Sequence, residues 1–254
     1  MAIAIRKPAE IEKLRRANVV VAKTLNYLKA NFCKPGVSLK EIDEAGEAYI
    51  RSLGARPSFK GLYGFPASVC TSVNEVIIHG VPTDYRLKEG DIIGLDIGTE
   101  IDGWYGDAAI TVGVGRIDEK DEELIAVARD TLYFAIDIIR AGMRFKELSY
   151  EIERYIKSRG YQPLHGFCGH GIGKKPHEEP ELPNYLEHGS PKSGPKIKNG
   201  MVFCIEPMIC QKLSTPQILE DKWSVVSEDG LRGSHYEHTV VVIDGKAQIL
   251  SKED

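Results

Sequence analysis

An internal repeat constrains the fold of this sequence more than any other feature. Moved forward by 106 positions, PGVSLKEIDEAGEAYIRSLGARP lies on AGMRFKELSYEIERYIKSRGYQP without a gap. Nine residues coincide, where average composition predicts about one or two. They are Gly36/Gly142, Lys40/Lys146, Glu41/Glu147, Glu47/Glu153, Tyr49/Tyr155, Ile50/Ile156, Ser52/Ser158, Gly54/Gly160 and Pro57/Pro163. Any two amphipathic helices that end in glycine share some residues, but here the loop residues match too. We predict two similar halves, about 8–115 and 116–250, in one domain over 1–254 with a cleft between them.

Helix and strand signals alternate in both halves. Apolar residues at three- and four-residue steps predict a first helix that ends before Pro35-Gly36. Ser38, with Glu41 three positions later, is a capping-box signal for the next one. The predicted elements are helices over about 8–32, 39–53, 118–140 and 146–159, with strands over about 67–79, a hairpin, and strands from about 163 to 249. This order predicts a mixed α/β (α+β) fold.

Composition limits the classes of protein to consider. The 254 residues carry 33 Lys+Arg and 37 Asp+Glu, and 42% are hydrophobic, which excludes a disordered chain and a dedicated DNA binder. The five cysteines form no C-x-x-C pair and indicate free thiols in a reducing compartment. The sequence shows no signal peptide and no apolar run near the ~20 residues that span a bilayer. We therefore expect a cytoplasmic, monomeric protein with no membrane partner.

Two aspartates lie on a strongly predicted hairpin within residues 90–115. Asp102-Gly103 is a two-residue turn that pairs Ile101 with Trp104. Asp107 then faces Gly98, and Asp96 lies on the same face of the sheet, a diagonal neighbour within ~7–8 Å. Two such close carboxylates repel each other, which predicts a bound cation or a shared proton. The alternative is a pair of aspartates facing solvent.

Three further residues complete a set of metal-ligand types. His170 lies among glycines in GFCGHGIG, and two acids interrupt apolar runs, Glu206 in MVFCIEPMI and Glu237 in HYEHTVVVI. A buried unpaired Glu is costly, although either could point outward from an edge strand. With Asp96 and Asp107 these residues form an oxygen-rich set for divalent metals. The remaining histidines have no such spacing and are expected at the surface or behind the ligands: His165, His188, His235 and His238.

Five segments in order resemble the methionine aminopeptidases over essentially the whole chain: SVNEVIIHGVP, LDIGTEIDGWYGDAA, GHGIGKKPHEEP, FCIEPM and SHYEHTVVV. The resemblance implies a pita-bread fold, with pseudo-twofold duplicated halves around a central antiparallel sheet. It also implies that Asp96, Asp107, His170, Glu206 and Glu237 bind two divalent metal ions. Few residues separate Glu206 from Glu237, so the chain is similar to the shorter first type of the family.

The resemblance also implies roles in the cleft. The catalytic residues would be His79, His177 and Glu206, and the substrate would contact His79, His177, Tyr63, Phe65, Cys70 and Trp223. Ordinary core packing is an equally good explanation of any one of these aromatics. Pro176 departs from the family, which often has an aromatic there. Phe59 and Leu62 keep an apolar lining but differ in detail.

The implied activity is removal of the N-terminal methionine from nascent proteins whose second residue is small, by a water that two metal ions activate. Co, Mn, Fe and Zn all suit this ligand set. Lys192, Lys196 and Lys198 could contact the ribosome from the loop 190–200, although we favour a solvated loop.

Two rival functions remain. The first is a proline-specific peptidase on the same fold; those relatives usually carry an additional N-terminal domain, and we expect none here. The second is a binding module of this fold that has lost its metal ligands, which the five intact ligands argue against.

Overall fold

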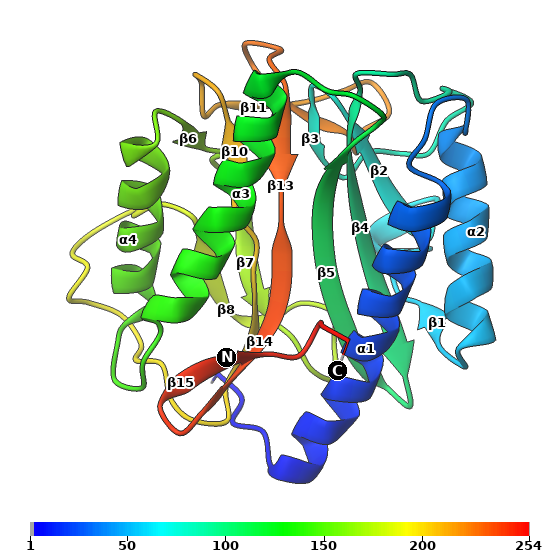
Figure 1. Ribbon diagram of the computed structural model, residues 1–254. Coiled ribbons are helices and arrows are strands. Elements are labelled where there is room, and N and C mark those ends of the chain that lie inside the picture. Colours follow the sequence, from blue (N-terminus) through cyan, green and yellow to red (C-terminus); the bar gives the residue numbers. More distant parts are fainter. Residues whose placement is uncertain (1–2, 254) are drawn as a thin grey trace.

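The structure is a computed structural model that describes residues 3–253 (Figure 1). The described helices are α1 (Pro8–Asn31), α2 (Leu39–Ser52), α3 (Glu119–Ile138), α4 (Phe145–Ser158) and a short 3-10 helix (Leu62–Gly64). The strands of the first half are β1 (Arg56–Pro57), β2 (Val69–Val73), β3 (Val76–Ile78), β4 (Ile92–Ile101) and β5 (Trp104–Gly113). Those of the second half are β6 (Gln162–Pro163), β7 (Cys168–Gly171), β8 (Glu178–Pro183), β9 (Val202–Ile205), β10 (Met208–Cys210), β11 (Pro216–Ile218), β12 (Val225–Ser227), β13 (Gly233–His235), β14 (Glu237–Ile243) and β15 (Lys246–Ile249). Each α-helix begins and ends within two residues of its predicted bounds.

A nine-stranded antiparallel sheet forms the centre of the molecule. Its strands run in the order β1-β4-β5-β14-β9-β7-β8, with β2 also on β4 and β15 also on β14. Figure 1 shows α1 beside β4 and β5 with α2 next to β1 and β2, and on the other side α3 beside β14 with α4 next to α3. The prediction of a mixed fold with a central antiparallel sheet is confirmed. Among residues 3–253, no helix is both long and apolar enough to cross a membrane.

Each helix pair encloses a hydrophobic core of its own. The first core includes Leu28, Ile42 and Ile50 from α1 and α2, packed against Ile93 and Leu95 of β4. The second centres on Phe203 of β9 and the buried residues of α3 and α4. The curled sheet thus has a separate core on either side of the β5–β14 pair. Because neither core depends on the residues where these two strands meet, those positions can be polar.

Contacts repeat between the two halves at matched positions. Turns after α2 and α4 close with the same bonds, Gly54 N to Arg51 O and Gly160 N to Lys157 O, each at a positive φ. The equivalent tyrosines also stack alike. Tyr49 lies 4.2 Å from Tyr27 between ring centroids, and Tyr155 lies 4.4 Å from Phe134. These matched contacts are what a duplicated structural unit would produce.

Close packing of α1 fixes the position of β5. A Cβ atom on Gly106 would lie 2.7 Å from the backbone nitrogen of Asn18, so only glycine allows the helix this near. Asn18 Oδ1 accepts a hydrogen bond from the nitrogen of Asp107 at 3.3 Å, and Thr99 Oγ1 donates to Ala17 O at 2.9 Å. The first helix therefore holds the backbone from which Asp107 projects.

Candidate metal centre

Strand pairing brings the predicted ligands together on one face of the central sheet. The hairpin register is as predicted: Gly98 pairs with Asp107, and Asp96 pairs with Ala109. Glu237 of β14 lies on the other side of Ala109. Since His238 pairs with Ile205, Glu206 comes next to Glu237. Asp96, Ala109, Glu237 and Glu206 thus form one row across four strands, and directly paired side chains point to the same face.

A second row lies two residues along each strand. Thr239 Oγ1 donates to the carbonyl of Asp107 at 2.8 Å, and Thr239 pairs with Cys204 of β9. Gly171 pairs with Phe203, so His170 lies beside Cys204. This row therefore runs Asp107, Thr239, Cys204, His170. The two rows account for all five predicted ligands.

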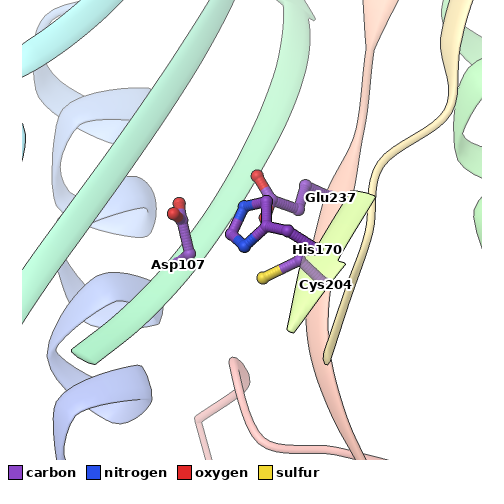
Figure 2. A group of neighbouring side chains, drawn as sticks. All are labelled: Asp107, His170, Cys204 and Glu237. Atoms are coloured by element: carbon purple, nitrogen blue, oxygen red, sulfur yellow. The ribbon is translucent and has the colours of Figure 1, made fainter. Parts of the chain in front are cut away.

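Figure 2 shows the side chains of Asp107, His170, Cys204 and Glu237 pointing toward a common space. One ligand atom from each lies within 4.8 Å of the others. Cys204 is not among the residues predicted for the site. Its signal was the period of two along a strand, which places Cys204 on the same face as Glu206.

Three carboxylate oxygen atoms of this site are buried without a hydrogen-bond donor among the described residues. Asp107 and Glu237 are each 3% exposed. Asp96 Oδ1, Asp107 Oδ1 and Glu237 Oε1 are buried and find no hydrogen-bond partner among the described residues. Leaving buried acceptors unsatisfied is costly, and a divalent cation is the partner that carboxylate oxygens would accept best. The residues present therefore fit a bound metal, and the solvent-facing alternative for the two aspartates is wrong.

Burial sets the charges in the centre. It raises the pKa of Asp96 to about 7 and raises the pKa of Asp107, Glu206 and Glu237 well above the usual range, with the neighbouring carboxylates adding to the effect in those three. Burial also lowers the pKa of His170 to about 3, which keeps its imidazole neutral and able to bind metal. His170 Nε2 lies 3.5 Å from Glu206 Oε1. Such a group of acids needs cations to stay ionised near neutral pH.

The ligands open into a cavity of about 520 Å³. All the predicted substrate-contacting residues line it: Tyr63, Phe65, Cys70, His79, His177 and Trp223, together with Phe59 and Leu62. Phe65 and Trp223 pack edge to face with centroids 5.2 Å apart. Pro176 is not among the lining residues. Phe167, which was not predicted, lines the cavity with its ring 5.6 Å from that of His79.

Two histidines reach the ligands from different depths. His79 follows β3 with φ at 57°, and burial lowers its pKa to about 4. Gly80 must follow it, because a Cβ there would lie 2.3 Å from Thr71 O. His177 lies at the mouth, its ring 4.4 Å from that of His170 and stacked on the ring of Tyr63. Partial desolvation lowers the pKa of His177 as well.

Some groups behind the ligands were not predicted in detail. His235 is buried, and its Nε2 lies 3.9 Å from Glu206 Oε2, which agrees with a position behind the ligands. Asn184 Nδ2 donates to the carbonyl of Glu206 at 2.8 Å and holds that end of β9. Neither residue has a local sequence signal, because each reaches Glu206 only through the folded sheet.

Acids and a neutral imidazole in a buried cluster beside an apolar cavity define a metal-dependent hydrolase. Residues 12–244 match the model of metallopeptidase family M24, and the chain belongs to this family. It is 60% identical to the methionine aminopeptidase of Helicobacter pylori, over 99% of this chain and all of that one. The solved methionine aminopeptidase of Thermotoga maritima superposes with a TM-score of 0.95 at 37% identity, covering 99% of this chain and 100% of that one. The prolidase of Pyrococcus furiosus superposes with a TM-score of 0.79 at 25% identity, covering 98% of this chain and 66% of that one. The predicted family and pita-bread fold are confirmed.

Proposed function

We propose that the chain, as one catalytic domain, removes the N-terminal methionine of proteins whose second residue is small. The observation that carries this proposal is the cluster of buried ligands opening into an apolar, aromatic cavity. The apolar lining of this cavity lies beside the candidate ligands, where the first side chain of a peptide substrate would bind. The named relatives, at up to 60% identity over their full lengths, support the same activity.

Asp96, Asp107, His170, Glu206 and Glu237 would hold two divalent metal ions. Such a pair, when bound, lowers the pKa of a water and polarises the scissile carbonyl. Four carboxylates against two dications leave the site close to neutral. The donors suit Co, Mn, Fe or Zn, and they do not select one.

The chain's own residues would move the proton and hold the peptide. Glu206, next to both His170 and Glu237, takes the proton from the attacking water and delivers it to the leaving amine. His79, neutral and buried, hydrogen-bonds the peptide and the oxyanion as charge develops on it. His177, at the mouth of the cavity, helps to hold the peptide in the same way. The free N-terminal amine would bind near Asp96, which restricts cleavage to chain ends.

The cavity suits methionine better than branched side chains. Phe65 and Trp223 present aromatic rings to an unbranched thioether, and sulfur–aromatic contacts contribute about 0.3–1.5 kcal/mol beyond apolar burial. Cys70 and Tyr63 complete the lining. This increment gives only a modest preference over leucine, so the shape of the cavity must supply the rest.

Nascent polypeptide N-termini are the proposed substrates, with the cytoplasm as the proposed location and a monomer as the working state. We also propose that the ribosome contacts this chain through Lys192, Lys196 and Lys198. These residues extend from the loop before β9, away from the metal ligands in sequence.

A comparison of kcat/KM for four peptides tests the function. We expect rapid cleavage of Met-Ala and Met-Gly peptides, slow cleavage of Leu-Ala, almost none of Met-Lys, and no activity after chelation of the metal. Equal rates for Met-Ala and Leu-Ala would show that the cavity does not select methionine. An Ala-Pro peptide is included because the prolidase shares this fold. Its preferential cleavage would replace the proposal with a proline-specific peptidase.

A further inference from the structure

Cys204 lies in the middle of the ligand rows without a role in the proposed function. It is fully buried on β9, between Thr239 and His170 in its row and two residues before Glu206. Its Sγ belongs to the group of ligand atoms that lie within 4.8 Å of one another, with atoms of Asp107, His170 and Glu237 (Figure 2). The thiol therefore shares the space of the metal ligands.

Buried carboxylate oxygens that lack hydrogen-bond donors lie beside this sulfur and indicate that a cation binds there. Asp107 Oδ1 and Glu237 Oε1 are buried without a hydrogen-bond partner among the described residues, and both belong to residues of the Cys204 group. The Cys204 thiol donates a hydrogen bond to the Glu237 carboxylate, and its Sγ lies 3.4 Å from the hydroxyl oxygen of Thr239. That hydroxyl already donates to the carbonyl of Asp107, so it leaves the sulfur free to face the carboxylates.

The other half of the molecule has no comparable donor. Its equivalent of Cys204 is Gly94, which precedes Asp96 by two residues as Cys204 precedes Glu206. A Cβ on Gly94 would meet the side chains of Ser72 and Thr111 at 3.4 and 3.6 Å. At this row position the sulfur is thus found in the second half, at the end of the centre that also holds His170, whereas Cys70 of the first half lines the cavity outside the Cys204 group.

We propose that Cys204 Sγ is a further metal donor of this centre, one that binds thiophilic ions such as zinc and biases the site toward them. The proposal rests on the metal centre of the proposed function. When the sulfur–metal bond forms, the S–H bond breaks and the thiol proton leaves to solvent, while the oxidation states of sulfur and metal do not change. Soft thiolates favour zinc, whereas manganese prefers the oxygen donors that surround it here.

Metal affinity and the spectrum of the cobalt-loaded protein test this assignment. We expect cobalt-loaded wild type to show a sulfur-to-cobalt charge-transfer band in the near ultraviolet, and Cys204→Ser to lose it. The affinity for zinc relative to manganese should fall at least about tenfold in Cys204→Ser, the lower end of what loss of a supporting contact costs a metal site. Cys204→Thr, which replaces the thiol by a hydroxyl and adds a methyl group that fills more of the space of the sulfur, should give the same result and guards against a folding defect in the serine variant.

Cys168→Ser and Cys70→Ser are the matched controls, because both thiols line the cavity but neither belongs to the Cys204 group. Both should keep the band and the zinc preference. A band that persists in both Cys204 variants, or an unchanged ratio of zinc to manganese affinity, would overturn the role of Cys204 while leaving the five-ligand centre intact. A wild type that binds neither ion would overturn the metal centre as well.

Discussion

Asp96 on β4 and Glu206, directly after β9, occupy the same place in the two halves. Each follows a Lys-x-Gly turn, with Gly90 and Gly200 at φ values of 89° and 83°. Gly90 N donates to Val114 O and Gly200 N donates to Val242 O, so the turns attach to the neighbouring strand alike. The paired residues then differ, because Asp96 has Ala109 beside it and Glu206 has Glu237. The halves therefore share backbone positions, while the side chains at those positions have diverged.

The connections differ as well. The first half joins β4 to β5 through the two-residue turn Asp102-Gly103, whereas the second half places β10 to β13 between β9 and β14. That insertion carries Trp223 to the cavity. Two halves with the same backbone arrangement can thus contribute different groups to one site. The first half supplies two aspartates from a single hairpin, and the second supplies the other candidate ligands and part of the cavity wall.

Replacement of Asp107 should have the largest effect on metal affinity and activity, because it removes one of the two aspartates that the first half supplies. We expect Asp107→Asn to lose more than about 100-fold in metal affinity, the upper end for supporting residues, and most activity. Titration calorimetry with manganese measures it. Asp102→Asn, an exposed aspartate in the same hairpin, is the control and should bind metal normally. Unchanged stoichiometry and affinity of metal binding in Asp107→Asn would contradict the assignment of the five residues as metal ligands.

The two cleft histidines come from different halves and should contribute unequally. His79→Ala is expected to lower kcat by about 10²–10³, as loss of an oxyanion donor does, with metal binding unchanged. His177→Ala should cost less, because His177 lies at the mouth, where water weakens its electrostatic effect. Steady-state kinetics beside metal titration separate the cases. Parallel loss of metal and activity in His79→Ala would make it a ligand.

The buried acids of the metal centre and Glu47, which lies outside it, should make the stability of the fold depend on pH in opposite directions. Burial raises the pKa of Asp96 to about 7, so without metal this group favours the folded state only when protonated. Hydrogen bonds from Lys60 and Ser68 lower the pKa of Glu47 to about 2, so its contribution is complete above about pH 4.5 and is lost as pH falls toward 2. Below about pH 6.5 the lowered pKa values of the buried histidines make stability rise with pH. Above it these histidines are neutral in the folded and the unfolded protein, so only the site acids should change stability there.

We therefore expect the free energy of unfolding of the chelated protein to fall by a few kcal/mol as pH rises from about 6.5 to 8, at about 1.4 kcal/mol per pKa unit. Urea unfolding with and without manganese measures this. Bound metal should remove most of the dependence. Stability of the chelated protein that stays flat over this range would argue against raised pKa values in the site.

The smallest effects should come from the matched turns. Gly54→Ala and Gly160→Ala each place a side chain at a positive φ with no neighbour within 4 Å, so the cost is conformational, about 1 kcal/mol each. Equal losses in urea unfolding would show that the two turns carry equal strain. A difference larger than about 0.5 kcal/mol, the usual error of adding independent sites, would show that the two turns contribute differently to stability despite their matched backbone.

Local signals were enough for much of this architecture and for part of its site. The turn Asp102-Gly103 determines the register of its hairpin, and so the relation of Asp96 to Asp107 followed from the sequence. Helix periodicity and capping located the four α-helices. Cys204 and His235 were not assigned to the site, because their neighbours depend on how β9, β14 and β7 align across long connections. No local pattern sets that alignment.

The central position of β14 has a consequence for how the chain is made. β14 lies between β5 and β9, yet it follows every other strand of that sheet except β15 in the chain. During synthesis the first half can fold early, but β5 then keeps one edge unpaired, and open edges invite contact with other chains. Glu237, the first residue of β14, arrives with the strand that closes this edge. Metal affinity should therefore appear only when the two halves join, and a growing chain that has not reached β14 is an aggregation risk without the means to bind its ions.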